Sequence, residues 1–184
     1  MKWTIDKSFS FCYGHRVHNQ TLNVNYSEDG CMACRHLHGH EGLIKISLEA
    51  DKLERGMVTD FKHLNWFKTF LNDALDHKFI MDINDPLIPH EVPDFCDSSG
   101  KLDFFLLKEQ SNGYFTPRLE IVSSKGAAVC EKYEGFVFVD FVPTSENLAA
   151  WLLKMAQNKM KGLDVSVVAI DYWETPKSHC GVSG

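Results

Sequence analysis

Alternating apolar and polar residues mark a first strand. From residue 3 to residue 17 the odd positions are mostly large and apolar, while the even positions include small or polar side chains. Successive side chains of a strand point to opposite faces, so this period of two predicts a half-buried strand. His15 falls in phase with Phe9 and Phe11 on the apolar face. A lone histidine there is more often a hydrogen-bonded core residue than a metal ligand, unless a second metal-binding segment lies alongside.

Residues 38–50 show the same alternation and predict a second strand, paired antiparallel with the first. His38 and His40 occupy even positions with the aliphatic residues that follow, whereas the other face is polar. Their imidazoles therefore share the buried face. A last strand is predicted over residues 165–174, and it ends with Glu174 on a largely apolar face. Taken alone, such a glutamate more often lies at a solvated strand end.

Two amphipathic helices are predicted from apolar residues spaced three and four apart. The first covers residues 61–75, with Thr59 or Asp60 placed to cap its start. The second begins at Thr144, after a proline, and ends near Gly162. Its apolar stripe of leucine, tryptophan and methionine is typical of core packing and does not indicate a cofactor site.

The stretch between these elements has a weaker pattern. Proline, glycine and asparagine mark turns from residue 86 to 142, and short strands are predicted at residues 104–107, 119–122 and 136–141. No chemical task follows from the residues of this stretch. We therefore expect one domain over residues 1–184, with a large insertion at about 86–142.

Composition narrows the class of protein. The 184 residues are 44% hydrophobic and 24% charged, as is ordinary for a soluble globular protein, and the net charge of −6 argues against a nucleic-acid partner. No apolar run is long enough to span a bilayer, and the first residues do not resemble a signal peptide. We therefore expect a cytoplasmic protein without a membrane partner, whose six cysteines are reduced thiols.

Potential metal ligands are concentrated between Cys31 and His40, where two thiols and three imidazoles occur within ten residues. His38 and His40 lie on one face of their strand, so with His15 they would form a three-histidine zinc site with an open coordination position. A structural zinc would instead require four protein ligands, and Cys31 or Cys34 could supply the fourth. The alternative to any metal site is a surface turn that happens to be rich in histidine.

Several motifs, taken in order, resemble the 6-pyruvoyl-tetrahydropterin synthase and 6-carboxy-tetrahydropterin synthase family. The resemblance covers residues 1–85 and 140–184 and rests on the following segments: His15 in a first strand, Cys34–His40, Gly56–Phe61, Leu75–His77, Pro143–Asn147 and Glu174–Thr175. It implies an α+β tunnelling fold (T-fold), an antiparallel sheet with two helices on one face. Subunits of this family assemble into an oligomeric barrel, in trimers stacked as hexamers, with active sites between subunits.

The resemblance also implies an enzyme, a zinc-dependent lyase acting on 7,8-dihydroneopterin triphosphate. Zn²⁺ on His15, His38 and His40 would stabilise oxyanions on the substrate side chain as a Lewis acid. Cys34 matches the general base, because a nearby cation favours the thiolate that this task requires. Outside the family context, Cys34 could equally be an inert thiol.

The remaining matches concern proton transfer and binding of the pterin ring. Asp76 and His77 match a pair that relays protons with the cysteine, although Asp-His pairs are also common at helix ends. Glu174 matches the carboxylate that grips the amino-pyrimidine edge of the pterin. Thr144 and Ser145 match positions that line the pterin pocket.

The spacing of the cysteine separates the two branches of the family. Cys34 lies four residues before His38, as in the 6-carboxy enzymes, whereas the 6-pyruvoyl enzymes tend to have six. The resemblance therefore favours a 6-carboxy-5,6,7,8-tetrahydropterin synthase, which releases acetaldehyde and triphosphate in 7-deazapurine and queuosine biosynthesis. The alternatives are a 6-pyruvoyl-tetrahydropterin synthase and a non-catalytic structural zinc module. Glu41-Gly42 departs from the family pattern, and Cys31 has no assigned role.

Overall fold

The computed structural model describes residues 1–184 and divides them into two compact units. Unit 1 comprises residues 1–12, 40–76 and 145–184, and unit 2 comprises residues 13–39 and 77–144. Strands β1 (Trp3–His15) and β2 (His38–Ala50) each contribute residues to both units. The placement of residues 86–142 as an insertion within a single domain remains a prediction.

Unit 1 is built on β1, β2, β7 (Ser166–Thr175) and β8 (Ser178–Ser183). β7 pairs antiparallel with both of its neighbours, with Tyr172 opposite Ile44 of β2 and opposite Cys180 of β8. Ile44 and Tyr172 are fully buried, as are the other core-facing residues Ile46, Leu48 and Ile170. The strands predicted from alternation at residues 3–17, 38–50 and 165–174 are thus confirmed, although β1 ends at His15.

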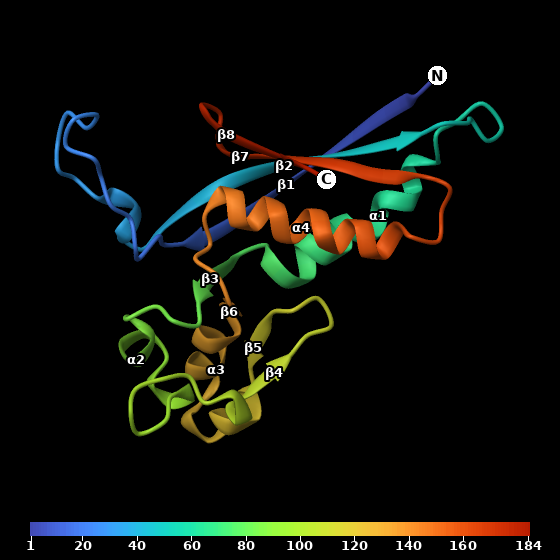
Figure 1. Cartoon of the computed structure of the whole chain (residues 1–184). Helices are drawn as coiled ribbons and strands as arrows, with labels where there is room; N and C mark the ends of the chain where they lie inside the picture. The colour runs from blue at the N-terminus through green and yellow to red at the C-terminus, as the bar shows by residue number, and fades with distance from the viewer. The chain divides into compact units, whose positions relative to one another are not determined.

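The helices of unit 1 cover this buried face of the strands (Figure 1). α4 (Ser145–Met160) confirms the second predicted helix. The first predicted helix is present but changes type along its length, from a 3₁₀ turn (Phe61–Leu64) through α1 (Asn65–Phe70) to a π-helical turn (Leu71–Leu75). The Asp60 side chain caps its start by accepting a hydrogen bond from the Lys62 N–H at 2.8 Å, as predicted.

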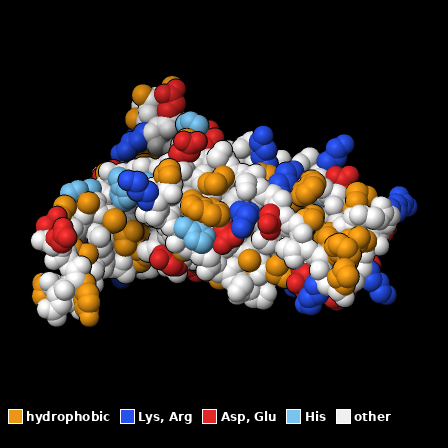
Figure 2. Space-filling model, turned by 90° about the horizontal axis from the view of Figure 1, so that it is seen from above, with side chains coloured by type: hydrophobic (Ala, Val, Ile, Leu, Met, Phe, Trp, Pro, Cys, Tyr) orange, Lys and Arg blue, Asp and Glu red, His pale blue; other side chains and the backbone are white.

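The opposite face of these strands is polar and carries no helix. Asp171 of β7 accepts hydrogen bonds from Lys45 Nζ at 2.8 Å and from His179 Nε2 at 3.0 Å. Seen from above, hydrophobic, basic, acidic and histidine side chains are mixed over the molecular surface (Figure 2). The alternation along the strands therefore separates a helix-covered apolar face from an uncovered polar one.

Unit 2 extends the strand pairing in parallel. β3 (Lys78–Asp82) lies parallel to the end of β1, with His15 opposite Ile80, and parallel to β6 (Phe136–Val139) on its other side. β5 (Phe115–Pro117) and β4 (Leu107–Glu109) follow in antiparallel pairing. Two short helices, α2 (Ile88–Glu91) and α3 (Ala127–Glu134), complete this unit around a core that contains Phe95, Tyr133 and Phe138.

Hydrogen bonding links all strands into one open, mixed eight-stranded sheet in the order β4-β5-β6-β3-β1-β2-β7-β8. The α+β fold class predicted from the sequence is confirmed, but the antiparallel pairing expected throughout is joined by the parallel pairs of β3. No helix of the protein is both long enough and apolar enough to cross a membrane.

Three details of the weakly patterned stretch differ from the predictions. Residues 119–121, predicted as a strand, form a 3₁₀ turn, because the Ile121 N–H bonds back to the Arg118 carbonyl and no neighbouring strand pairs with this segment. Residues 104–106 also form a 3₁₀ turn, capped by Asp103, and the strand begins only at Leu107. The predicted strand at residues 136–141 is present but ends at Val139.

Candidate metal centre

His15 is oriented by a backbone carbonyl. It ends β1, is fully buried, and its Nδ1 lies 2.6 Å from the Pro143 carbonyl oxygen. A carbonyl oxygen can only accept a hydrogen bond, so Nδ1 must carry the proton and donate it. The lone pair of the neutral ring is then on Nε2, which is the arrangement commonly found for a metal-ligating histidine.

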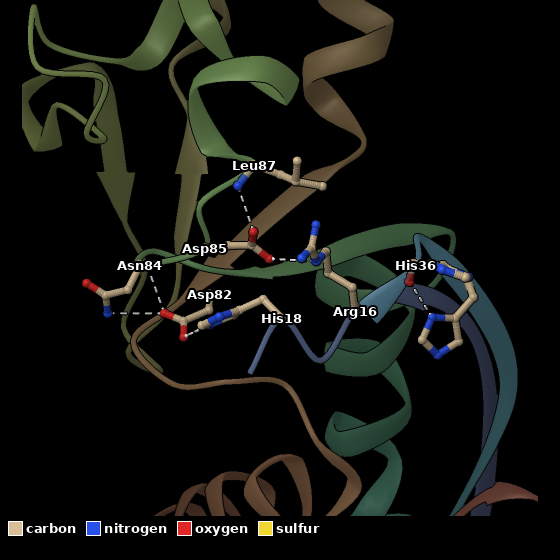
Figure 3. Close-up of polar contacts among 8 residues, drawn as sticks. Arg16, His18, His36, Asp82, Asn84, Asp85 and Leu87 are labelled. Carbon is tan, nitrogen blue, oxygen red and sulfur yellow. Dashed lines mark hydrogen bonds and ion pairs between the residues drawn. The ribbon is translucent and has the colours of Figure 1, made fainter. Parts of the chain in front are cut away.

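His38 is oriented in the same way. Its Nδ1 lies 2.7 Å from the carbonyl oxygen of His36, so Nδ1 donates and Nε2 again carries the lone pair (Figure 3). The rings of His15 and His38 lie with their centroids 4.5 Å apart. Two separate carbonyls, from Pro143 and from His36, thus select the same tautomer in both histidines.

Gly39 permits the close approach of the two strands that carry these histidines. A Cβ atom added at Gly39 would lie 2.9 Å from the Tyr13 carbonyl oxygen, closer than real Cβ contacts allow. Because that oxygen belongs to the backbone, no side-chain rotation could relieve the contact. The glycine between the two histidines therefore has a packing reason.

His40 of β2 and Glu174 of β7 complete the group. His40 Nε2 lies 3.4 Å from Glu174 Oε1, and one ligand atom from each of His15, His38, His40 and Glu174 lies within 4.8 Å of the others. Ligand atoms about 2.0–2.1 Å from one zinc ion are at most about 4.2 Å apart, so a small side-chain adjustment would bring these atoms to that range. Three imidazoles and a carboxylate are a donor set that suits zinc.

Three carboxylates act on the thiol of Cys180. Burial and, to a smaller extent, the carboxylates of Glu146, Asp171 and Glu174 together raise the pKa of the Cys180 thiol to about 11. Cys180 is therefore protonated near neutral pH and is a poor candidate for a base or nucleophile. The Glu174 carboxylate favours a cation bound beside it, whereas Asp171 is already paired with Lys45.

The cysteines predicted near the metal lie outside this four-residue group. Cys34 is half-buried in the 3₁₀ turn Ala33–Arg35, and its carbonyl oxygen accepts a hydrogen bond from the Val17 N–H at 2.7 Å. Cys31 is exposed. Glu174, rather than a cysteine, is thus the fourth potential ligand, a position that the spacing of the cysteines did not predict.

Asp76 and His77 follow directly after the π-helical turn of residues 71–75. The Asp76 N–H donates to the Leu71 carbonyl at 2.8 Å, and Asp76 Oδ1 accepts the Cys12 N–H at 2.7 Å. His77 has a φ of 58°, which is uncommon for a residue with a side chain. Both π-turns and left-handed residues are frequent at functional sites, because the surrounding structure must impose them.

Thr144 and Ser145 lie where β6 leads into α4. Ser145 is the first residue of α4, and the Thr144 N–H donates to the Val142 carbonyl at 2.7 Å. The preceding residue, Pro143, supplies the carbonyl that orients His15. Sequence reasoning missed that carbonyl and the one from His36, because every residue has a carbonyl and no side-chain pattern distinguishes these two.

Comparison with known proteins identifies the family. The family model described as 6-pyruvoyl tetrahydropterin synthase matches residues 4–184. This chain belongs to that family. The 6-carboxy-5,6,7,8-tetrahydropterin synthase of Aquifex aeolicus is 30% identical over 188 residues, which cover 97% of this chain and 96% of the relative. As a member of the 6-pyruvoyl tetrahydropterin synthase family, the protein is a lyase of the tetrahydropterin synthase type.

Solved structures share the fold of this chain. A crystal structure of an uncharacterised protein from Wolinella succinogenes is 46% identical, with a TM-score of 0.94 and coverage of 100% of this chain and 99% of that one. The 6-pyruvoyl tetrahydropterin synthase of Caenorhabditis elegans is 20% identical, with a TM-score of 0.55 and coverage of 100% and 96%. The second likeness shows the T-fold alone, which confirms the predicted fold class.

Proposed function

We propose that this protein is a zinc-dependent 6-carboxy-5,6,7,8-tetrahydropterin synthase. It would convert 7,8-dihydroneopterin triphosphate with release of acetaldehyde and triphosphate, in the biosynthesis of 7-deazapurines such as queuosine. The observation that carries the metal-dependent part is the group of His15, His38, His40 and Glu174. The four-residue spacing from Cys34 to His38 and the name of the Aquifex aeolicus relative support the 6-carboxy branch.

In this proposal His15, His38 and His40 hold the zinc. The hydrogen bonds to the Pro143 and His36 carbonyls hold the rings of His15 and His38 with Nε2 directed away from these carbonyls. Zinc, when bound, supplies a Lewis acid that stabilises negative charge on the oxygens of the substrate side chain. The protein's own contribution at this point is to fix ring orientation before the substrate arrives.

Cys34, Asp76 and His77 are the proposed catalytic residues. Cys34 would take a proton from the substrate carbon beside the hydroxyls, and Asp76 and His77 would relay protons. The left-handed backbone of His77 and the hydrogen bond from Cys12 to Asp76 support a held orientation for this pair. A rigid orientation is what a proton relay requires, because transfer depends on hydrogen-bond distance.

Glu174, Thr144 and Ser145 are the proposed substrate-binding residues. Thr144 and Ser145 would line the pterin pocket, and the Glu174 carboxylate would accept hydrogen bonds from the ring. Because Glu174 lies 3.4 Å from His40, its contact with substrate would lie next to the metal ligands. Replacement of Glu174 should therefore alter zinc affinity as well as substrate binding, unlike replacement of Thr144.

We further propose a homo-oligomer, a trimer or a hexamer, with active sites between subunits and neither nucleic acid nor membrane as a partner. The open sheet ends in β8, which is hydrogen-bonded to β7 on one side. A free strand edge is a natural place for another subunit to pair. Light scattering after size-exclusion chromatography would give the mass; a monomer at micromolar concentration would contradict this assembly.

Replacement of Cys34 by alanine tests whether this residue is a catalytic base or a ligand of a structural zinc. We expect Cys34→Ala to keep its zinc and its fold while turnover of dihydroneopterin triphosphate is lost, since the cysteine lies outside the four-residue group. Cys31→Ala, a change at an exposed thiol three residues away, is the matched control and should retain both zinc and turnover. Loss of zinc together with the fold in Cys34→Ala would favour a structural zinc module.

A further inference from the structure

Two side-chain pairs connect the residues that follow His15 to the end of β3 and to the turn after it. Arg16 Nε lies 3.2 Å from Asp85 Oδ2, and the two side chains are 10% and 1% exposed. His18 Nε2 lies 3.0 Å from Asp82 Oδ2. Figure 3 shows both pairs, with Arg16 and His18 reaching toward the carboxylates from the segment after β1.

The carboxylates are themselves held by the backbone of their own turn. Asp85 Oδ1 accepts the Leu87 N–H at 2.8 Å. Asp82 Oδ1 accepts both the N–H of Asn84 at 2.9 Å and its side-chain amide at 3.2 Å (Figure 3). In each carboxylate one oxygen is fixed by the turn, which leaves the other oxygen in a defined position for Arg16 or His18.

Val17, which lies between Arg16 and His18, is hydrogen-bonded to Cys34. The Val17 N–H donates to the Cys34 carbonyl oxygen at 2.7 Å. A second bond, from Arg35 Nε to the Gln20 carbonyl at 2.9 Å, joins the same two segments one residue further along. The 3₁₀ turn that contains Cys34 is thus attached to residues 17–20, residue 18 is attached to the end of β3, and residue 16 is attached to the turn after β3.

We propose that the pairs Arg16–Asp85 and His18–Asp82 form a positioning clamp for Cys34. The segment from residue 16 to residue 37 has no regular structure apart from the short turn at Ala33–Arg35, and residues 21–26 are exposed. A connection of this length moves readily unless other contacts hold it. The clamp holds Val17, and through it Cys34, at a constant distance from His15, which is fixed by Pro143.

This inference rests on the proposed role of Cys34 as the base. Residues 16, 18, 82 and 85 do not need to touch the substrate, so they are positioning residues. A group that is displaced by about 1 Å from its reacting atom can cost about a hundredfold in rate, whereas substrate affinity depends on other contacts. Loss of the clamp should therefore lower kcat and leave KM and zinc content close to those of the wild type.

The test uses the zinc-loaded protein and the variants His18→Phe, which removes the hydrogen-bonding nitrogen, Asp82→Asn, and their combination. We expect each single variant to lower kcat about ten- to hundredfold, the range typical of residues that orient a catalytic group without contacting the substrate. The double variant should lose no more than the more severe single one, because both changes remove the same contact. Alkylation of Cys34 by iodoacetamide, followed on its peptide by mass spectrometry, should become faster as the half-buried thiol is released.

Asp94→Asn is the matched control. Asp94 is also a partly buried carboxylate of unit 2, paired with Lys125 and Tyr133, and it has no contact with the segment of Cys34. This variant should leave kcat and Cys34 alkylation unchanged. Because His18→Phe keeps an aromatic ring at a partly exposed position and leaves the Asp82 turn intact, it gives a readout even if Asp82→Asn fails to fold.

Two results would overturn the clamp. One is a lower melting temperature in His18→Phe with kcat and Cys34 alkylation unchanged below that temperature, which would make the pairs stabilising contacts only. The other is alkylation that is unchanged or slower in the variants. If the wild type does not turn over dihydroneopterin triphosphate, the proposed function fails, and the alkylation rates alone still decide whether the clamp exists.

Discussion

Replacing Gly39 by alanine should disturb the candidate metal centre by separating the two strands that carry its histidines. Gly39 lies between His38 and His40 on β2, and an added Cβ would lie 2.9 Å from the Tyr13 carbonyl oxygen of β1. That is about 0.5 Å closer than ordinary contact, and both partners are backbone. The two strands must therefore move apart at the point where His15, His38 and His40 converge.

The expected cost follows from the type of contact. Forcing extra volume into a well-packed site typically lowers the unfolding free energy by about 1–3 kcal/mol. Here the displaced strands also bear the proposed metal-binding histidines. We expect Gly39→Ala to lose about 1–3 kcal/mol of unfolding free energy and at least about tenfold in zinc affinity. Elsewhere in a strand, exchange of glycine for alanine where the backbone permits it is neutral or stabilising by less than about 1 kcal/mol.

Gly181→Ala is the control that distinguishes the contact with a backbone oxygen from the general effect of replacing a strand glycine by alanine. A Cβ at Gly181 would also meet an oxygen at 2.9 Å, but this is the side-chain Oδ1 of Asp171, which can rotate away. Unfolding in urea and zinc competition with a chromophoric chelator should show a clear loss in Gly39→Ala and a small change in Gly181→Ala. Equal behaviour of the two variants in both assays would refute the reasoning.

Four further outcomes are expected. The hydrogen bonds from Lys125 and Tyr133 lower the pKa of Asp94. The ionised Asp94 therefore stabilises the fold above its ordinary pKa of 3.8, and this stabilisation is lost as the pH falls through the lowered pKa. Asp94→Asn should remove this acid dependence of the melting temperature. Burial and the hydrogen bond to Asp94 raise the pKa of Tyr133 to about 12. The stabilisation that protonated Tyr133 supplies is therefore complete below its ordinary pKa of 10.0 and is lost between pH 10.0 and about 12. Tyr133→Phe should reduce the fall in melting temperature over this alkaline range. His77→Asn should fold normally, because asparagine tolerates the left-handed backbone, while His77→Val should lose about 1–3 kcal/mol in urea unfolding and both should lose turnover. Phe95→Ala should cost about 3–5 kcal/mol in the same assay, because the ring is fully buried in the core of unit 2.

Those elements that bury one face were predictable from the sequence. β1, β2 and β7 each have a helix-covered face and an open face, so apolar and polar residues alternate along them as the side chains alternate between buried and exposed. β3 was missed because it is short, lies between two parallel neighbours, and ends in three consecutive buried residues, Ile80–Asp82. β8 was missed because its side chains are mostly small or exposed, and its pairing is visible only in three dimensions.

The candidate metal centre was predictable to the extent that it depends on the spacing of its histidines. His38 and His40 share a strand face in phase with His15, and the structure places the three side chains close together; their role as zinc ligands stays a prediction. The position of Glu174 beside His40 depends on the pairing of β7 with β2, which local patterns do not contain. The pairing of Arg16 with Asp85 could not be predicted either, because a buried ion pair between distant segments follows from the tertiary fold.

The product formed by the zinc-loaded protein tests the central claim most directly. Incubation with 7,8-dihydroneopterin triphosphate, followed by mass spectrometry of the pterin and an assay for acetaldehyde, should give 6-carboxy-5,6,7,8-tetrahydropterin and equimolar acetaldehyde. The reaction should stop when a chelator removes the metal and resume when zinc is restored. A 6-pyruvoyl product without acetaldehyde, or turnover that does not depend on metal, would contradict the account.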